Sequence, residues 1–149
     1  MRQFEYRHVV TLEETNLVGN VYFTRYFSWQ GRCRELFLRE HAPEVFDQLH
    51  GDLALVTLSS SCDFFDELRI SDEVRVAMDL EGVYQNRVTM GFEYRRLSPE
   101  PEAVVARGRQ EVACMRRGEA GLYPVPIPDG LRRALDHYRH PNGKTGALR

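Results

Sequence analysis

Hydrophobic and polar positions divide the chain into one long helical segment and several strand-like segments. Residues 4–10 alternate loosely and predict a first strand, whereas residues 22–41 follow a helical period. On that helix two adjacent lines of side chains form a wide apolar band: Phe23, Phe27, Gln30, Arg34 and Leu38, and beside them Tyr22, Tyr26, Trp29, Cys33 and Phe37. We therefore expect a largely buried helix that ends near Pro43, because the residue before a proline avoids the helical region.

The rest of the chain is strand-like until near its end. The pattern predicts four strands and then one short helix: 53–65, 72–80, 87–95 and 104–115, followed by 129–138. Two of these strands have an apolar face, made of Val74, Val76, Met78 and Leu80 in one and of Val88, Met90, Phe92 and Tyr94 in the other. The last strand carries small residues such as Gly108 at its even positions, which allows a helix to pack closely against it.

This order of elements predicts an α+β fold in which a long central helix is wrapped by an antiparallel sheet of about five strands. We expect a single domain over residues 1–140 and a flexible C-terminal tail over residues 141–149. A sheet of this kind leaves its second face and its edges open. We therefore expect the protein to dimerise by pairing of strand edges.

Composition and charge exclude several classes of function. The 149 residues suit one domain, and the net charge of −2 favours neither nucleic acid nor an anionic membrane as partner. No segment is long and apolar enough to span a bilayer. The three cysteines, Cys33, Cys62 and Cys114, are widely spaced and form no Cys-x-x-Cys pair, so we expect no metal site and a reducing, cytoplasmic location.

The segment before the long helix is the strongest candidate for a site, because a helix start offers free backbone amides to an oxygen anion. It reads Asn16-x-x-Gly19-x-Val21-Tyr22. The amides from Gly19 to Val21 are candidates for an oxyanion contact. Asn16 could orient water through its carbonyl oxygen or donate its amide to a substrate carbonyl; alternatively it makes only an Asx turn or a cap.

With this motif before the helix, the chain resembles hotdog-fold thioesterases of the 4-hydroxybenzoyl-CoA thioesterase type. Two departures stand out, since Asn16 replaces the aspartate of that family and Phe23 replaces its histidine. An asparagine cannot act as a base or form an acyl anhydride. Residues 15–27 and 29–35 are most similar to the thioesterases of enediyne polyketide biosynthesis, which also lack a carboxylate in the loop.

The resemblance implies a set of site residues and a substrate. Asn16 and Arg34 would be catalytic, and the substrate-binding residues would be Gly19, Val21, Tyr22, Tyr26 and Thr57. The substrate would be a polyene β-ketoacyl thioester on the acyl carrier protein of a polyketide synthase. Hydrolysis would release a β-keto acid, which loses carbon dioxide to give a methyl ketone polyene. No cofactor is implied, and the family is commonly a tetramer, here expected to be built from dimers.

Structural alternatives remain open at this stage. Arg34 could form an ion pair with Glu35 or Asp63, Tyr22 and Tyr26 could belong to the core, and Glu14 is a further candidate for a base. The chain could also be a general acyl-CoA thioesterase, or an acyl-binding module without catalysis. A hydratase is disfavoured, because the loop contains no Asp/His pair.

Overall fold

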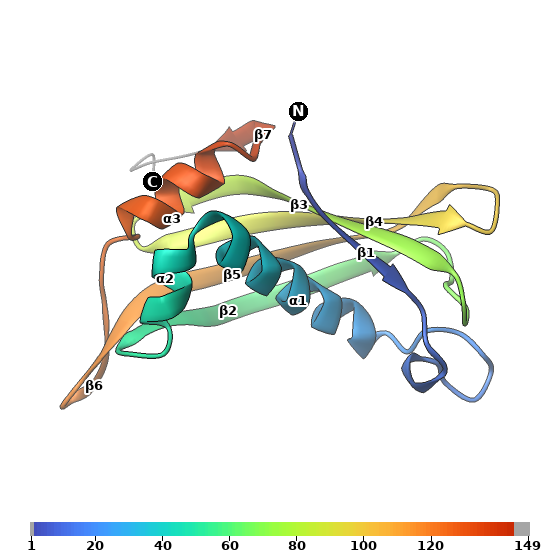
Figure 1. The fold of residues 1–149 in the computed structure, drawn as a ribbon, viewed down its shortest axis with the longest axis horizontal. Helices are drawn as coiled ribbons and strands as arrows, with labels where there is room; N and C mark the ends of the chain where they lie inside the picture. Colours follow the sequence, from blue (N-terminus) through green and yellow to red (C-terminus); the bar gives the residue numbers. More distant parts are fainter. Residues whose placement is uncertain (1, 145–149) are drawn as a thin grey trace.

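A long helix, α1 (Thr24–His41), lies along one face of a seven-stranded sheet (Figure 1). The computed structural model describes residues 2–144. The other elements, in chain order, are β1 (Phe4–Val9), the 3-10 turn η1 (Leu12–Glu14), α2 (Pro43–Gln48), β2 (Leu53–Phe64), β3 (Glu73–Tyr84), β4 (Arg87–Ser98), β5 (Ala103–Gly118), β6 (Gly121–Pro124), α3 (Asp129–Asp136) and β7 (Arg139–Lys144). The α+β arrangement with a long helix against an antiparallel sheet is thus as predicted.

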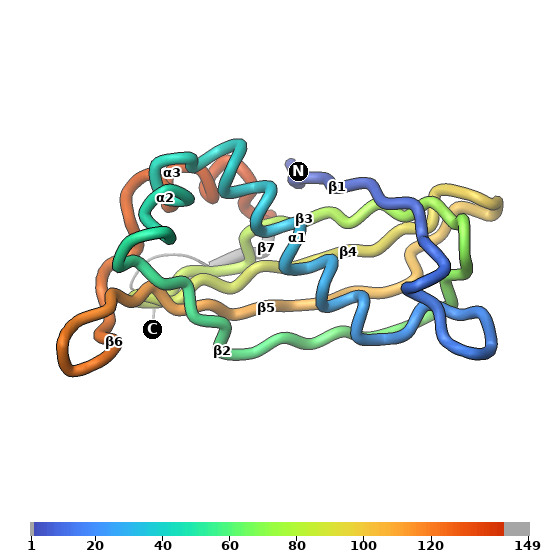
Figure 2. Tube along the Cα trace, turned by 60° about the horizontal axis from the view of Figure 1, so that its bottom comes forward, coloured from blue at the N-terminus to red at the C-terminus, as the bar shows by residue number. Residues whose placement is uncertain are grey.

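Five long strands form the sheet in the order β1-β3-β4-β5-β2, with every neighbouring pair antiparallel. Two short strands that the pattern did not predict add to it (Figure 2). β6 pairs with β5 from Met115 to Gly118, where β4 no longer covers that edge, and β7 runs parallel to β3 beyond the end of β1. Both strands satisfy backbone groups that the shorter neighbours leave unpaired.

The C-terminal segment differs from the expected tail. Residues 141–144 belong to β7, which pairs Arg139 with Leu80 and Lys144 with Gly82. The amide of Leu80 also donates to the carbonyl of Tyr138 at 2.8 Å. These contacts with β3 hold residues 139–144 in the sheet, where a flexible tail had been expected from residue 141. Residues 145–149 lie outside the described part of the chain.

The core lies between α1 and the sheet, and it uses the predicted faces. The inward residues of β3 and β4 are buried without exception: Val74, Val76, Met78, Leu80, Val88, Met90, Phe92 and Tyr94. On α1, the line from Tyr26 through Trp29 and Cys33 to Phe37 is buried as well. The helix was expected to begin at residue 22, but α1 begins at Thr24, and Tyr22 and Phe23 before it are about half exposed and lie outside the core.

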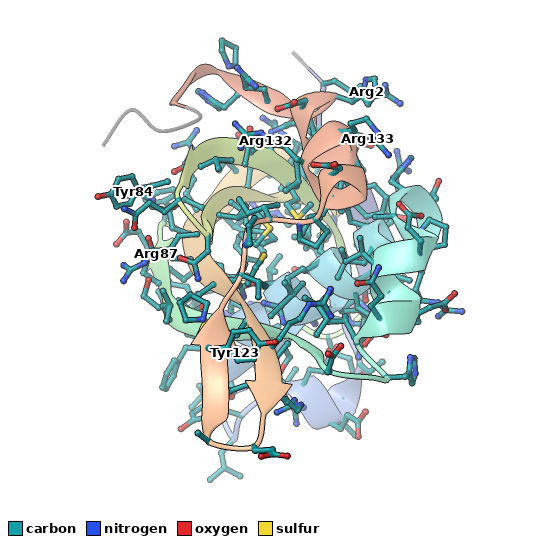
Figure 3. All side chains as sticks on the ribbon, turned by 90° about the vertical axis from the view of Figure 1, so that its left-hand side faces the viewer. Arg2, Tyr84, Arg87, Tyr123, Arg132 and Arg133 are labelled. Atoms are coloured by element: carbon teal, nitrogen blue, oxygen red, sulfur yellow. The ribbon has the colours of Figure 1, made fainter. Side chains whose placement is uncertain are left out.

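The far end of the core, opposite the loop before α1, is closed by α3. Leu131, Ala134 and Leu135 of α3 are buried, and Arg132 and Arg133 project from the same helix (Figure 3). The rings of Phe37 and Tyr138 pack edge to face at 5.4 Å. Within residues 2–144, no helix combines the length and the hydrophobicity of a membrane span.

Candidate functional site

The loop between η1 and α1 is folded back on itself by backbone pairing. Thr15 and Val21 form an antiparallel bridge, and the amide of Val21 donates to the carbonyl of Leu68 at 2.8 Å. Gly19 has a φ of +89°, a conformation that glycine adopts without strain. The loop is therefore a defined turn, although its tip is open to solvent.

Asn16 is exposed, and its side chain has a fixed orientation. Its Oδ1 accepts hydrogen bonds from the amides of Val18 at 3.0 Å and Asn20 at 3.2 Å. Because both partners are N–H donors, Oδ1 must face them and Nδ2 must face away. Nδ2 has no hydrogen-bond partner among residues 2–144. The Asx turn is thus present, and of the two catalytic uses considered for Asn16 this geometry favours donation from Nδ2 over orientation of water by the oxygen.

The amides expected to contact an oxyanion are already occupied. The amide of Gly19 donates to the Asn16 carbonyl at 3.0 Å, while those of Asn20 and Val21 donate to Asn16 Oδ1 and to Leu68. The start of α1, by contrast, has no side-chain cap. The first-turn amides of Phe23 and Thr24 are therefore the backbone donors that a ligand at the helix start can reach.

A surface cavity of about 630 Å³ adjoins this loop. Its lining comes from η1, the loop and the first turn of α1. The lining residues are Leu12, Glu13, Thr15, Asn16, Leu17, Tyr22, Thr24 and Arg25. The structure therefore brings Asn16 and Tyr22 together around one cavity. Apolar side chains are prominent at its rim, where Leu17 is fully exposed.

Tyr26 occupies a different environment from Tyr22. Its side chain is buried, and its ring packs against those of Trp29, Phe64 and Tyr94 at 4.8 to 5.3 Å. Burial raises the pKa of its hydroxyl above the ordinary value. The structure thus places Tyr26 in the core, next to the cavity-lining turn rather than in the cavity.

Arg34 reaches β2 and β5 from the middle of α1. Its Nη1 donates to Gln110 Oε1 at 2.7 Å and to Thr57 Oγ1 at 3.2 Å. Among residues 2–144 no carboxylate forms an ion pair with it, so the pairs considered with Glu35 and Asp63 are not made. Burial lowers the pKa of the half-buried guanidinium, and Glu35 opposes that effect. An arginine nevertheless stays charged, so Arg34 is a cation whose hydrogen-bond partners, Thr57 and Gln110, are both neutral.

Two buried glutamines lie behind Arg34. Gln110 is 5% exposed and Gln30 is fully buried. Gln30 Nε2 donates to the Ser61 carbonyl at 3.1 Å, and Gln30 Oε1 accepts from Ser60 Oγ at 2.8 Å and, over a longer 3.5 Å, from Gln110 Nε2. Sequence reasoning did not assign either glutamine to the site. The signal that could have identified them is that Gln30 occupies an inward position of the long helix and Gln110 an inward position of the last long strand.

Glu14, the further candidate for a base, is buried and fully engaged. Its carboxylate accepts from His8 Nε2 at 2.7 Å, from the Trp29 indole at 2.9 Å and from the Thr11 amide at 2.9 Å. Burial alone raises the pKa of this carboxyl, but the hydrogen bonds outweigh burial and hold the pKa below its ordinary value. Glu14 is thus placed to anchor the loop rather than to take a proton from water.

Asn16 and Arg34 do not meet within one chain. Arg34 lies about three turns beyond the first residue of α1, which is about 15 Å along the helix axis, whereas Asn16 precedes that helix. Thr57, by contrast, contacts Arg34 from β2, the strand at the sheet edge. The predicted site residues therefore form two groups, one at the loop and one around Arg34.

The second cavity and the Cys33 thiol belong to neither group of predicted site residues. A cavity of about 460 Å³ at the opposite end is lined by residues that include Arg2, His41, Glu44 and Arg133, and it contains none of the predicted site residues. Within residues 2–144, no group of His, Cys, Asp and Glu side chains is arranged to hold a metal ion. Burial raises the pKa of the Cys33 thiol to about 12, which suits a core residue rather than a nucleophile.

Comparison with known proteins gives a consistent result. Residues 10–135 match the model of the Thioesterase-like superfamily, whereas none of the curated proteins compared with the chain matches it. Among solved structures, the Dynemicin thioesterase is 51% identical, over 93% of this chain and 99% of that chain, with a TM-score of 0.91. That structure was determined to describe polyene binding.

Two more distant structures share the fold. A 1,4-dihydroxy-2-naphthoyl-CoA thioesterase from Synechocystis is 23% identical over 94% of this chain and 100% of that chain, with a TM-score of 0.81. A variant 4-hydroxybenzoyl CoA thioesterase complexed with 4-hydroxybenzoyl CoA is 12% identical over 91% of this chain and 99% of that chain, with a TM-score of 0.80. Together with the family match, these likenesses confirm the predicted hotdog fold.

Proposed function

The chain belongs to the thioesterase-like superfamily and is a thioester hydrolase, and from this premise we propose that its substrate is a polyene β-ketoacyl thioester on an acyl carrier protein of an enediyne polyketide synthase. The observation that carries the proposal is Arg34, a half-buried cation whose side-chain partners, Thr57 and Gln110, are both neutral. Such a cation suits a substrate that carries or develops negative charge near the thioester. Similarity to a thioesterase that binds polyene supports the acyl part of the proposal.

A thioester is already activated, so its hydrolysis needs position and charge stabilisation more than a strong base. In the proposed reaction Asn16 Nδ2 donates a hydrogen bond to the thioester carbonyl oxygen, and water attacks the carbonyl carbon. The carbon–sulfur bond then breaks, the carrier thiol leaves with a proton from the attacking water, and a β-keto acid remains. The acid gives its proton to water, and loss of carbon dioxide from the resulting β-keto carboxylate leaves an enolate, which Arg34 stabilises until a proton completes the methyl ketone.

These two roles require Asn16 and Arg34 to approach neighbouring atoms of one substrate. Their separation along α1 prevents this within a protomer, so we place Asn16 of one protomer opposite Arg34 of another. The edge strand β2 suits such an assembly, because it carries Thr57 together with the exposed apolar side chains of Leu58 and Phe64. The proposed assembly is a tetramer built from such dimers.

Two further parts of the proposal concern the cellular compartment and the docking of the carrier protein. Cys33, Cys62 and Cys114 are free thiols, which favours a reducing compartment such as the cytoplasm. An acyl carrier protein is acidic, and Arg25 lines the cavity beside Asn16. We propose that Arg25 lies at the edge of the carrier's docking surface, where complementary charge would speed encounter.

The test is hydrolysis of a carrier loaded with a polyene β-ketoacyl chain, followed by mass spectrometry of the released products. We expect the β-keto acid and the methyl ketone to appear, and faster than from the matching CoA thioester. Faster turnover of the CoA thioester would favour the alternative of a general acyl-CoA thioesterase. Absence of release above the background rate from either thioester would rule out the proposed substrate. The alternative of a module without catalysis is not carried forward, since the family is one of thioesterases.

A further inference from the structure

The buried side of the Arg34 guanidinium rests on a chain of two glutamine amides that begins at a backbone carbonyl. We propose that Gln110 positions Arg34 for its role and that Gln30 sets the orientation of the Gln110 amide, an inference that rests on the proposed function of Arg34. Neither glutamine needs to touch the substrate. Both are therefore positioning residues.

The direction of every hydrogen bond in this chain follows from its first member. The Ser61 carbonyl can only accept, so the Gln30 amide must present Nε2 to it, at 3.1 Å. Gln30 Oε1 is then left to accept from Ser60 Oγ at 2.8 Å and from Gln110 Nε2 at 3.5 Å. With its Nε2 turned to Gln30, Gln110 presents Oε1 to Arg34 Nη1, at 2.7 Å.

The reversed orientation is unfavourable at each step. A flipped Gln110 would place its NH₂ group against the guanidinium, so that two donors would face each other in a buried position. A flipped Gln30 would turn its oxygen toward the Ser61 carbonyl and would leave two acceptors facing each other. Because unsatisfied buried polar groups are costly, the chain has one favoured arrangement.

A neutral acceptor has a specific consequence for the site. A carboxylate in place of Gln110 would hold Arg34 equally well, but it would neutralise the charge that the substrate is proposed to meet. An apolar residue would leave the charge but release the long arginine side chain to other rotamers. Glutamine fixes the geometry and preserves the positive charge.

Strand β5, which carries Gln110, also provides the space that the Gln30 side chain requires, at Gly108. A Cβ atom on Gly108 would lie 2.4 Å from Gln30 Nε2 and 2.9 Å from the Ser61 carbonyl oxygen. Only a residue without a side chain therefore lets Gln30 reach Ser61. The arrangement joins three elements, because Gln30 and Arg34 lie on α1, Ser61 on β2 and Gln110 on β5.

The experiment compares Gln110→Met, which keeps the length of the side chain but loses the acceptor, with Gln110→Glu, which keeps the shape but adds a charge. The control is Gln48→Met, because Gln48 Oε1 also accepts from an arginine, Arg116 Nη2 at 3.2 Å, but away from both site groups. Each variant is assayed with a polyene β-ketoacyl thioester and with a matching acyl thioester that lacks the β-keto group.

We expect each Gln110 variant to lower the rate at which methyl ketone forms from the β-keto substrate by about tenfold to a hundredfold, the range that small displacements of a site group produce. For the simple acyl thioester we expect the rate of hydrolysis to fall by less than about threefold, because that substrate presents no charge for Arg34 to meet. Equal losses on the two substrates, or no loss on either, would overturn the proposal. The Gln48→Met control should react with both substrates at the wild-type rates.

A second measurement separates this inference from the proposed function. In protein labelled with ¹⁵N-arginine, the Arg34 guanidinium signals are assigned by their loss in Arg34→Lys, and the exchange of their hydrogens with water is measured. Exchange should be about tenfold faster in Gln110→Met and unchanged in Gln48→Met. Unchanged exchange in a folded Gln110→Met protein would refute the positioning role, whatever the wild-type enzyme hydrolyses. If Gln110→Met does not fold, Gln30→Met takes its place and must show the same increase.

Discussion

The indole N–H of Trp29 donates to a carboxylate oxygen of Glu14 at 2.9 Å, and this bond joins the core of α1 to the turn that precedes the loop. The same carboxylate accepts from His8 Nε2, so β1 is tied to it as well. The backbone carbonyl of Glu14 in turn accepts from the amide of Tyr22 at 2.9 Å. The conformation of the loop that carries Asn16 therefore depends on Glu14.

We expect Glu14→Gln to lower the free energy of unfolding at neutral pH by about 1–3 kcal/mol, because a buried acceptor that serves four donors becomes partly a donor itself. The pKa of Glu14 is lower in the folded protein than the ordinary value of 4.5. Its ionised form therefore stabilises the fold above that value, and the stabilisation is lost as the pH falls through the lower, folded pKa. Urea unfolding of the wild type and of Glu14→Gln over a pH series measures the difference between their free energies of unfolding. A stability gap that stays constant below pH 4.5 would contradict the assignment.

Asn16→Asp and Asn16→Ala separate the structural role of the Asn16 side chain from its proposed catalytic role. The aspartate retains an oxygen for the amides of Val18 and Asn20 but loses the Nδ2 donor, whereas the alanine loses both. We expect both variants to slow hydrolysis of the β-ketoacyl thioester by about a hundredfold, the typical cost of removing one oxyanion donor. Only the alanine should lower the melting temperature. Full activity of Asn16→Asp would show that the donor is not used.

Gly108→Ala tests the close contact between β5 and Gln30. Its Cβ would meet Gln30 Nε2 at 2.4 Å, so the side chain or the strand must shift, and we expect a loss of about 1–3 kcal/mol in unfolding free energy. Gly31→Ala is the control, because it places a Cβ in open space on α1 and should be neutral or stabilising by up to about 1 kcal/mol. Thermal or urea unfolding compares the two. Equal stability of the two variants would argue against the contact.

Mixing of the Asn16→Ala and Arg34→Ala variants, with formation of the methyl ketone as the activity, tests whether one site draws on two protomers. If Asn16 of one protomer acts with Arg34 of another, a mixed dimer of Asn16→Ala and Arg34→Ala contains one intact site and one doubly altered site. After unfolding and refolding together, the mixture should recover about a quarter of the wild-type activity, since about half of the dimers are mixed. Each variant refolded alone is the control. No recovery, despite exchange of protomers shown by mass spectrometry, would place both residues in a single protomer.

The order of the long helix, the five long strands and the last helix followed from the sequence alone, as did the inward faces of α1, β3 and β4. Val74, Val76, Met78 and Leu80 alternate because successive side chains of a strand point to opposite faces, and the line from Tyr26 to Phe37 repeats because a helix returns to the same face every three to four residues. These are local consequences of backbone geometry. The motif around Asn16 was equally readable, since it lies in one continuous stretch.

Contacts between distant residues were decided only by the tertiary structure. Gln110 meets Arg34 across 76 residues of sequence, and β7 pairs with the part of β3 beyond Met78 that β1 does not cover. The direction of the Asn16 amide depends on which backbone groups its loop turns toward it, and the approach of Gln30 to Ser61 depends on the space above Gly108. No periodicity encodes such contacts, because they arise only when segments far apart in the chain are packed against one another.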